Sequence, residues 1–445
     1  MTGMTPESHL NFRIEGGRKL SGEVTVNTSK NGAVALLAAS LLNHGKTVLR
    51  HVPRIEEVER ILEVLRSIGV MATWSGDTLT LTRPDTLALA DIDRAAAART
   101  RSILMFIGAL AHDTPRFSLP HAGGCKLGKR TIRPHLFALE KFGVGVATES
   151  EAYDVTGGAL RPAEIILLEA SDTATINALL AAASIAGTST IKYASANYQV
   201  QEACHFLSRL GVVIGGIGTA TLFVTGVAHI EADIEYPLAE DPTDAMFFIA
   251  AAAVTGSALT IRRAPIDFLE LELLTLSTMG FCYSLSAPYV SENGFTKLVD
   301  IETEPSALVA AAEPIHPRPY PGLNIDNLPF FAVIATAAKG QTLVHDWVYD
   351  HRAIYYTELS KLGADVLLAD PHRVFITGPT PLHAADLVCP PALRPATILL
   401  IAMLAAKGTS VLRQVYSINR GYALLVERLE KIGAKVEAER EPICL

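Results

Sequence analysis

A lysine and an asparagine stand at the expected start of an apolar helix, in the segment VTVNTSKNGAVALLAAS. Lys30 and Asn31 come where a predicted strand leads into this helix, so they occupy its N-terminus. Helix N-termini bind anions through free N–H groups, and a lysine there adds a positive charge. The pair predicts an anion site; the alternative is a solvated lysine at an ordinary helix start.

A second candidate is a basic, glycine-rich loop that carries a thiol. The stretch HAGGCKLGKRTIRPH, residues 121–135, surrounds Cys125 with two lysines and two arginines, Arg130 and Arg133. Nearby cations lower the pKa of a thiol and make it reactive. The loop is either a reactive site or a cationic surface loop. Cys204, in EACHFLSRL, is expected to pack in the interior instead.

Asp326 and a set of arginines are the remaining candidates. Asp326 follows a Pro/Gly turn in PYPGLNIDNLPFF and is either an N-terminal helix cap or a general base held on a rigid turn. Arg101, Arg352, Arg394 and Arg420 each stand beside an apolar segment, where an unpaired charge is costly. Buried arginines usually pair with a protein carboxylate, but several at corresponding points of repeated units favour a shared anionic ligand.

Other chemistries lack their sequence patterns. No Gly-rich nucleotide loop and no HExxH occurs, the thirteen histidines show no ligand spacing, and the five cysteines form no CxxC. We therefore expect no metal, no cofactor and no disulfide framework. The net charge of −8 argues against nucleic acid or a membrane surface as the main partner.

The bulk composition indicates a globular protein with two domains, since 445 residues are too many for one hydrophobic core. The first residues contain no apolar stretch typical of a secretory signal. The longest stretches without charged residues, 173–191 and 210–230, are interrupted by polar residues and do not predict a membrane span. We expect a cytoplasmic protein, and the sequence makes no prediction of its oligomeric state.

The elements that must position these residues form a repeat. A phrase of the type Leu-x-x-hydrophobic-Gly occurs six times at intervals of 68 to 83 residues. Each glycine is expected to end a helix in the left-handed conformation. These glycines are Gly69, Gly143, Gly211, Gly280, Gly363 and Gly433.

Most of these units also contain an Ala-rich helix that is apolar nearly all round, such as INALLAAASIAG, followed by a strand. Such helices are buried rather than amphipathic. The predicted order of elements in each unit is therefore strand, buried helix, strand, outer helix, strand, strand. Six units, three per domain, predict an α/β fold of two similar lobes with inward-facing helices.

These motifs together resemble the enolpyruvyl transferase family over about residues 12–439. The match rests on Lys30-Asn31, GGCKLG with Arg130, PYPG with Asp326, VYDHR and INRGY. The cysteine loop and INRGY make the branch that acts on UDP-N-acetylglucosamine a better match than the enolpyruvylshikimate phosphate branch.

The resemblance implies a two-lobed inside-out α/β barrel of six repeated units, with residues 30–240 as lobe one and 1–29 plus 241–445 as lobe two. It implies that phosphoenolpyruvate binds in the cleft between the lobes. Its phosphate would contact Lys30, Arg130 and Arg420, and its carboxylate Arg352 and Arg394. The remaining implied roles are Arg101 close to this site, Asp326 as the base that deprotonates the acceptor hydroxyl, and Cys125 as the cysteine that handles phosphoenolpyruvate and reacts with fosfomycin.

The acceptor half of the family's site is changed in this sequence. Where relatives grip a diphosphate with a Lys followed by Ser-Val-Gly, this chain has Glu169, Ala170, Ser171, Asp172 and Thr173. Carboxylates at the first and fourth of these positions would repel a diphosphate. An Arg-Pro-hydrophobic-Asp stretch becomes residues 130–133, which puts Arg133 where relatives have an Asp, and an Asp-Arg-hydrophobic-Glu stretch becomes residues 241–244.

Three functions remain open on this reading. The first is enolpyruvyl transfer to UDP-N-acetylglucosamine in peptidoglycan synthesis. The second, which the substitutions favour, is transfer to the 3′-hydroxyl of UMP in nucleoside antibiotic biosynthesis. The third is a non-catalytic binding relative. We expect Asn31, Arg133, Ser171, Asp172, Thr173 and Asp326 to contact the nucleotide acceptor.

Overall fold

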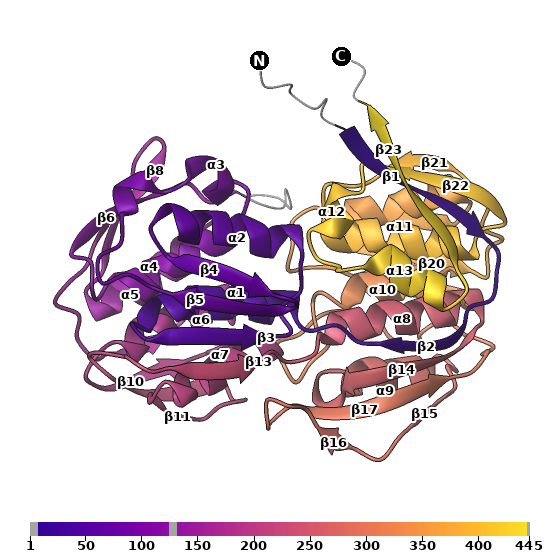
Figure 1. Ribbon diagram of the computed structural model, residues 1–445. Helices are drawn as coiled ribbons and strands as arrows, with labels where there is room; N and C mark the ends of the chain where they lie inside the picture. The colour runs from indigo at the N-terminus through magenta and orange to yellow at the C-terminus, as the bar shows by residue number, and fades with distance from the viewer. Residues whose placement is uncertain (1–7, 124–130, 443–445) are drawn as a thin grey trace.

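The computed structural model describes residues 8–123 and 131–442, which form two adjoining lobes (Figure 1). Each lobe has its own interior. One hydrophobic cluster contains residues from 33–238, and the other combines residues from 12–26 with residues from 245–436. The N-terminal segment therefore packs with the second half of the chain.

Strand pairing divides the chain in the same way. Strand β2 (Ser21–Thr25) pairs in parallel with β14 (Ala258–Pro265), whereas β13 (Ile234–Pro237) returns to pair in parallel with β3 (Lys46–Arg50). In each of these pairings, both strands belong to the same lobe. We call residues 30–240 lobe one and residues 1–29 plus 241–445 lobe two, and we propose these as the domain limits.

Within the described residues the strands form six sheets. In lobe one the sheet orders are β13-β3-β5-β4, β6-β8-β7 and β11-β12-β10-β9, where β4 is Met71–Ser75, β5 Thr78–Thr82, β6 Arg116–Pro120, β7 Gly145–Thr148, β8 Ala152–Thr156, β9 Glu164–Ile166, β10 Gly187–Lys192, β11 Val213–Gly215 and β12 Thr221–Gly226. In lobe two they are β15-β17-β14-β2 with β16 beside β17, β18-β20-β19 and β21-β22-β1-β23, where β1 is Ser8–Gly16, β15 Tyr283–Leu285, β16 Tyr289–Val290, β17 Lys297–Thr303, β18 Gly340–His345, β19 Asp365–Leu368, β20 Arg373–Gly378, β21 Asp386–Val388, β22 Gly408–Arg413 and β23 Lys435–Pro442.

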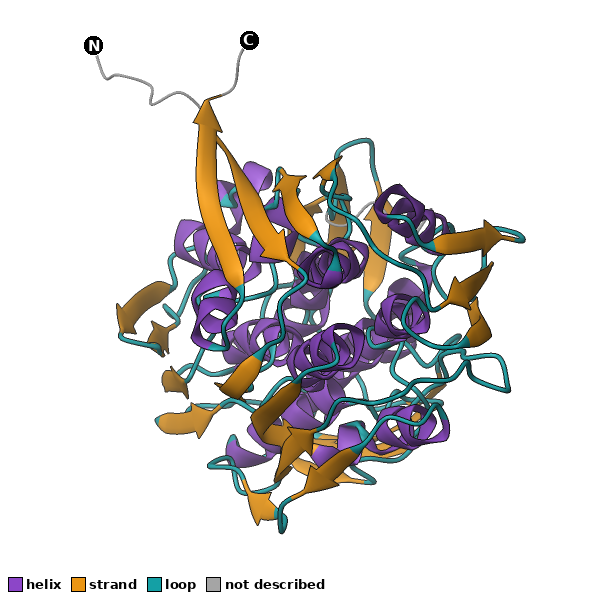
Figure 2. Cartoon of the chain, turned by 90° about the vertical axis from the view of Figure 1, so that its right-hand side faces the viewer, coloured by secondary structure: helices purple, strands orange, loops and turns teal. Residues whose placement is uncertain are grey.

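A set of apolar helices lies inside these sheets, and Figure 2 shows strands around the helices of the lobe that faces the viewer. Their residues are buried almost without exception. They are α1 (Lys30–Ala39), α4 (Met105–Leu110), α6 (Asp172–Ala183), α8 (Pro242–Thr255), α10 (Leu328–Ala335) and α11 (Leu393–Ala405). The sequence predicted five of these helices; α4 escaped because it is short and has no closing glycine.

A second set of helices ends at the repeated glycines, and all six glycines have positive φ, between 83° and 100°. The predicted left-handed helix ends are therefore confirmed. The helices are α2 (Glu56–Ser67), α5 (Arg133–Phe142), α7 (Tyr198–Arg209), α9 (Glu270–Thr278), the 3₁₀ helix η5 (Ala353–Leu362) and α13 (Leu425–Lys431). Short helices complete the fold: α3 (Arg94–Ala97), α12 (Tyr416–Asn419), η1 (Ser40–Leu42), η2 (Leu89–Asp91), η3 (Arg101–Leu104) and η4 (Ile266–Phe268).

The chain crosses between the lobes at two antiparallel segments that hydrogen-bond to each other. The Ser29 N–H donates to the Ala239 carbonyl at 2.8 Å, and the Asp241 N–H donates to the Asn27 carbonyl at 2.8 Å. Because the first crossing leads directly into α1 and the second into α8, both helix N-termini are fixed at the junction of the lobes.

Glu202 of α7 is fully buried beside this junction. One carboxyl oxygen accepts the Ala239 N–H at 2.6 Å, while the other has no hydrogen-bond partner among the described residues. That second oxygen lies against Gly32, where an added Cβ would come within 1.8 Å of it, so a larger residue at position 32 would require the Glu202 side chain to move. Burial, together with the nearby charges of Glu240 and Asp241, raises the pKa of Glu202 to about 8.

We predict that Glu202 makes folding depend on pH. A carboxyl group whose pKa is raised on folding takes up a proton when the chain folds, so stability falls as pH rises from about 4.5 to about 8 and then levels off. Glu202→Gln removes the contribution of this group to the slope and should be more stable than the wild type at about pH 8.5. Urea unfolding across this pH range measures the free energy of unfolding of the wild type and of the variant. The control is Glu235→Gln, which changes an exposed residue. An unchanged pH dependence in Glu202→Gln would contradict the prediction.

Candidate active site

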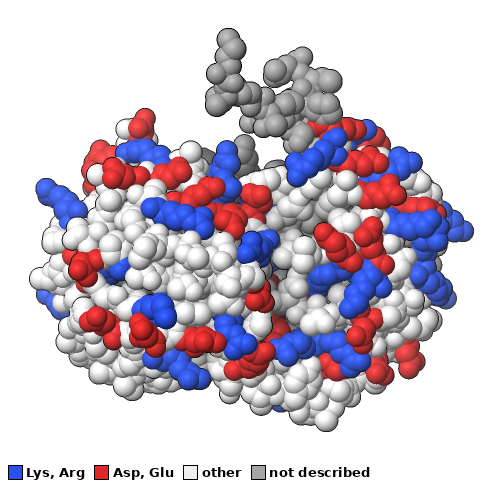
Figure 3. All heavy atoms as spheres, in the orientation of Figure 1, with Lys and Arg blue, Asp and Glu red and all other residues white. Residues whose placement is uncertain are grey.

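A cavity of about 580 Å³ opens between the lobes, a size typical of small-molecule sites. Figure 3 shows charged side chains of both signs along the line where the lobes meet. Lobe one contributes the starts of α1 and α6, η3 and residues 193–199, and lobe two contributes mainly 267–272 and 317–326. Lobe two also adds 347–350, Arg352, 393–395 and Arg420.

Lys30 begins α1 and lines this cavity. The Ser29 hydroxyl caps the helix by accepting the Gly32 N–H at 2.8 Å. The Lys30 main-chain N–H donates across the junction to Asp241 at 3.3 Å. The positive charge of Lys30 is among the causes that lower the pKa values of Glu57 and Asp326, so its ammonium group lies close to both carboxylates.

Arg420 of lobe two reaches across the cleft to Glu57 on α2. Its Nε lies 3.1 Å from Glu57 Oε2, while the Thr100 hydroxyl donates to the other carboxylate oxygen at 2.6 Å. Burial alone would raise the pKa of Glu57, but the charges of Lys30 and Arg420 hold it below its ordinary value. Glu57 is therefore an ionised group that is only 3% exposed, and it joins the two lobes through an ion pair.

Arg352 is held rigidly within lobe two. Its Nε and Nη2 donate to the two oxygens of buried Asp346, at 2.5 and 2.9 Å, and Nη2 also donates to the Ile325 carbonyl at 2.9 Å. The Tyr356 hydroxyl donates to the same carboxylate at 2.5 Å. A bidentate pair of this kind fixes the plane of the guanidinium group as well as its position.

Arg394 connects the second crossing to Asp326. It donates to the Tyr422 hydroxyl at 2.8 Å and to the Thr243 hydroxyl at 2.7 Å, and its Nη2 lies 3.3 Å from Asp326 Oδ2. Thr243 in turn donates to Asp241, the N-terminal cap of α8. The altered 241–244 stretch thus positions an arginine of the cavity.

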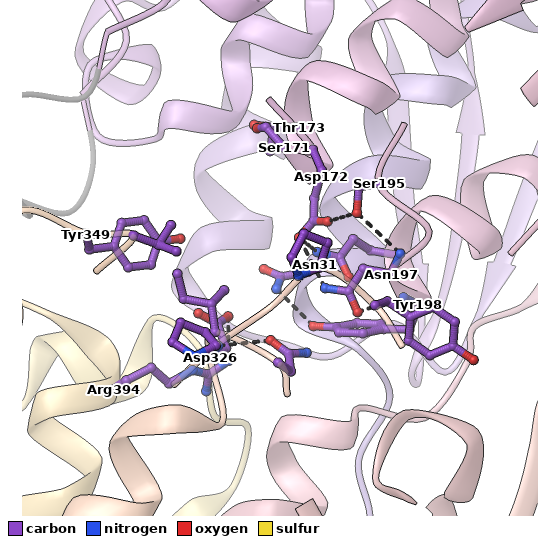
Figure 4. A pocket seen from close by; sticks show the side chains of 18 of the residues that line it. Asn31, Ser171, Asp172, Thr173, Ser195, Asn197, Tyr198, Asp326, Tyr349 and Arg394 are labelled. Carbon is purple, nitrogen blue, oxygen red and sulfur yellow. Dashed lines mark hydrogen bonds and ion pairs between the residues drawn. The ribbon is translucent and has the colours of Figure 1, made fainter. Parts of the chain in front are cut away.

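Asp326 is not the helix cap that the sequence left as an alternative. The N-cap of α10 is Asn327, without a side-chain capping bond, and the Asp326 carboxylate points to Arg394 instead (Figure 4). Burial would raise the pKa of Asp326, but the charges of Arg394, Arg352 and Lys30 lower it below the ordinary value. An ionised carboxylate therefore faces the cavity, with its side chain 24% exposed.

We call the part of the cavity around the start of α6 its outer half. Asn31 donates to the Tyr198 hydroxyl at 2.9 Å, and the Thr173 hydroxyl lies 3.4 Å from His135 Nε2. Ser171 is the N-cap residue of α6 but makes no side-chain capping bond. Ser171 and the exposed Glu169 also line the cavity.

Asp172 is bound by three side chains of the segment that precedes and begins α7. The Ser195 hydroxyl donates to Oδ1, and the amides of Asn197 and Gln199 donate to Oδ2 at 3.2 and 2.5 Å. Burial raises the pKa of Asp172 to about 6, although these hydrogen bonds act to lower it. The negative charge of Asp326 adds to the rise. Asp172 is thus an anchored acceptor rather than a loose surface charge.

Ten of the predicted site residues line this one cavity. They are Lys30, Asn31, Arg101, Ser171, Asp172, Thr173, Asp326, Arg352, Arg394 and Arg420. Cys125 and Arg130 lie outside the described residues. Arg133 is exposed at the start of α5 and, in the part of the chain that the structure describes, does not line the cavity.

Sequence reasoning missed the groups that hold the arginines: Glu57, Asp346, Thr243 and Tyr422. Three of the arginines pair with protein carboxylates, whereas the sequence favoured a shared anionic ligand over such partners. One pattern contained the information, because Glu57 falls on the apolar face of the helix RIEEVERIL, where an acid needs a partner. The other partners are far from their arginines in sequence or lack a distinctive spacing.

Two of the described cysteines outside the loop, Cys204 and Cys389, are buried, whereas Cys282 is exposed. Burial raises the pKa of Cys204 and of Cys389 to about 12, which confirms interior packing for Cys204. Among the described residues no cluster of His, Cys, Asp and Glu side chains could hold a metal ion. No helix in residues 8–123 or 131–442 is long and apolar enough to cross a membrane.

Comparison with known proteins decides the family. Residues 14–440 match the model of EPSP synthase (3-phosphoshikimate 1-carboxyvinyltransferase). The chain belongs to this family. It is 31% identical over 430 residues to UDP-N-acetylglucosamine 1-carboxyvinyltransferase of Bradyrhizobium diazoefficiens, covering 96% of this chain and 98% of that one. It is also 31% identical over 431 residues to the protein of that name from Treponema denticola, covering 97% and 99%.

Solved structures show the same fold. The enolpyruvyl transferase NikO from Streptomyces tendae superimposes with a TM-score of 0.83 at 24% identity, covering 98% of this chain and all of that one. EPSP synthase from Acinetobacter baumannii gives 0.73 at 19% identity, covering 97% and 100%. The chain is therefore an enzyme, an enolpyruvyl (carboxyvinyl) transferase with a mixed α/β fold, and the non-catalytic alternative is set aside.

We predict that Glu57 positions Arg420 for this activity. Glu57→Gln keeps the shape but removes the charge that holds the guanidinium group at the cleft. The kcat/KM for phosphoenolpyruvate should fall roughly 10- to 100-fold, since a small misplacement of a binding group has effects of this size. Steady-state phosphate release measures it. Glu59→Gln, on the same helix but half-exposed, is the control; equal kinetics of the two variants would show that the ion pair is not needed.

Proposed function

We propose that the inner half of the cavity binds phosphoenolpyruvate. The observation that carries this is the convergence of Lys30 from lobe one with Arg352, Arg394 and Arg420 from lobe two around Asp326. We assign Lys30 and Arg420 to the phosphate, and Arg352 and Arg394 to the carboxylate. Cations that the fold already holds in place stabilise developing charge without reorganisation, and one such donor contributes about 3 kcal/mol.

Three further residues complete the proposed site. Arg101 lines the cavity and donates to the Thr131 carbonyl at 2.8 Å, and we propose that it lies close to the bound phosphoenolpyruvate. The family resemblance adds Arg130 at the phosphate and Cys125 as the cysteine that handles phosphoenolpyruvate and reacts with fosfomycin. Both lie outside the described residues and stay predictions.

The proposed reaction needs one base and several fixed cations. A proton adds to carbon-3 of phosphoenolpyruvate, which makes carbon-2 electrophilic. The acceptor oxygen bonds to carbon-2 while its proton passes to Asp326, which gives a tetrahedral, phosphate-bearing ketal. The bond from carbon-2 to the phosphate oxygen then breaks, carbon-3 loses a proton, and the enol ether and inorganic phosphate leave. Closed lobes exclude water that would otherwise attack the activated carbon.

The contact between Asp326 and Arg394 links binding to catalysis in this proposal. The guanidinium group of Arg394 lies 3.3 Å from Asp326 and helps to lower the pKa of that carboxyl, so Asp326 is ionised but weakly basic. The carboxylate of phosphoenolpyruvate would compete for Arg394. Its negative charge would also raise the pKa of Asp326, because like charges disfavour ionisation. Asp326 would thus become a stronger base once the first substrate is bound.

For the acceptor we propose a compact uridine nucleotide, UMP, which would react at its 3′-hydroxyl. Aromatic side chains that suit stacking with a nucleobase also line the cavity, namely Tyr193, Phe268 and Tyr320. A single phosphate would then need only one cation, for which Arg318 in the cavity wall is available. The carboxylates at the start of α6, Glu169 and Asp172, disfavour a diphosphate there.

UDP-N-acetylglucosamine is the second candidate acceptor. Its support is the name shared by relatives that are 31% identical over nearly the whole chain. A carboxylate about 4 Å from a phosphate oxygen repels it by roughly 4 kcal/mol at an effective dielectric constant near 20. Two such groups therefore weigh against a diphosphate in this chain.

A panel of acceptors tests the proposal. We predict that UMP exceeds UDP-N-acetylglucosamine in kcat/KM by at least about tenfold, or about 1.4 kcal/mol in transition-state stabilisation. Phosphate release at saturating phosphoenolpyruvate is the measurement, with mass spectrometry to confirm an enolpyruvyl product. Shikimate 3-phosphate is the control acceptor. A tenfold preference for UDP-N-acetylglucosamine would show that the substitutions at the start of α6 do not exclude it.

The finer architecture and the location of the protein are also proposals. We propose that the two lobes form an inside-out α/β barrel of six repeated units, supported by six sheets in the described residues and six helix-ending glycines. We propose a cytoplasmic location, because phosphoenolpyruvate and nucleotides are substrates found there.

A further inference from the structure

Among the described residues, three donors bind the carboxylate of Asp172, which leaves its set of hydrogen bonds incomplete. A carboxylate offers about four acceptor positions. Ser195, Asn197 and Gln199 occupy three of them, one on Oδ1 and two on Oδ2. Asp172 lines the cavity and is only partly buried, so one position on Oδ1 is left for a group that enters the cavity.

The surroundings of Asp172 determine what that group must be. All three protein partners donate, which keeps the carboxylate an acceptor, and the remaining position therefore suits an O–H or N–H donor. A phosphate or carboxylate oxygen offers no proton there and would be repelled. The complementary ligand group is a hydroxyl or an amine.

A second carboxylate, that of Asp326, faces the same space from lobe two. Figure 4 shows both groups at the cavity, with Asn31 between them in this view. The two are close enough for the charge of Asp326 to act on Asp172. A single acceptor hydroxyl has one proton and can satisfy only one of them. Two donors on neighbouring carbons can satisfy both at once.

We propose that Asp172 determines acceptor specificity by accepting a hydrogen bond from the hydroxyl next to the one that Asp326 deprotonates. The acceptor must then carry a vicinal diol. This rests on the proposed function, in which the ribose 3′-hydroxyl reacts, and it assigns the 2′-hydroxyl to Asp172. Segment 195–199 holds the carboxylate in place for this contact, so its donors act as positioning residues.

The test compares UMP with 2′-deoxy-UMP, which lacks only the proposed donor. Phosphate release gives kcat/KM for both acceptors in the wild type, in Asp172→Ala and in Asp154→Ala. Asp154 is an exposed residue of the same lobe and serves as the control. The wild type and the control should prefer UMP roughly 10- to 100-fold, the range expected for a hydrogen bond to a charged group. In Asp172→Ala the preference should fall to within about threefold.

The ratio within one variant separates specificity from damage to the fold, since a misfolded protein loses both activities together. If Asp172→Ala does not fold, Ser195→Ala replaces it. That variant loosens the carboxylate and should lower the UMP preference several-fold. Equal use of the two acceptors by the wild type, or an unchanged preference in whichever variant folds, would overturn the role of Asp172 while leaving the proposed UMP acceptor intact. Failure of the wild type to use UMP, with activity on UDP-N-acetylglucosamine, would overturn both.

Discussion

Buried guanidinium groups must have fixed anionic or polar partners, and this constraint organises the cavity. Desolvating a cation is costly unless hydrogen bonds and an opposite charge compensate. Each of Arg352, Arg394 and Arg420 lies against a carboxylate, and each partner comes from a different part of the chain. The partners fix where the positive charges stand before any ligand arrives. The lobes, their crossings and their helix starts are arranged so that these pairs meet.

The carboxylate partners differ in how easily a ligand can take their place. Asp346 is fully buried and shared between Arg352 and Tyr356, so it serves the fold. Asp326 is partly exposed to the cavity and has a longer contact with Arg394, so an incoming carboxylate can compete with it. Glu57 joins the two lobes. A ligand that binds between the lobes therefore meets an ion pair, Glu57–Arg420, that already connects them.

Sequence patterns predicted what depends on local structure. The six helix-ending glycines, the apolar helices and the arginines beside them follow from periodicity and from the need for positive φ. The carboxylate partners of the arginines could not be predicted in this way, because contacts such as Arg420–Glu57 join residues 363 positions apart and exist only after the lobes pack. Asp172 was predicted both to repel a diphosphate and to contact the acceptor. The donors that anchor it, including Gln199, are ordinary polar residues whose role appears only in three dimensions.

The central claim is that Asp326 competes with phosphoenolpyruvate for Arg394 and then serves as the base. The most direct measurement compares kcat with the dissociation constant for phosphoenolpyruvate in Asp326→Asn. The account predicts opposite changes: kcat falls by about 10²- to 10⁴-fold, as for loss of a general base, while binding stays equal or becomes tighter because the arginine is released. Near-normal turnover, or loss of phosphoenolpyruvate binding together with turnover, would contradict it.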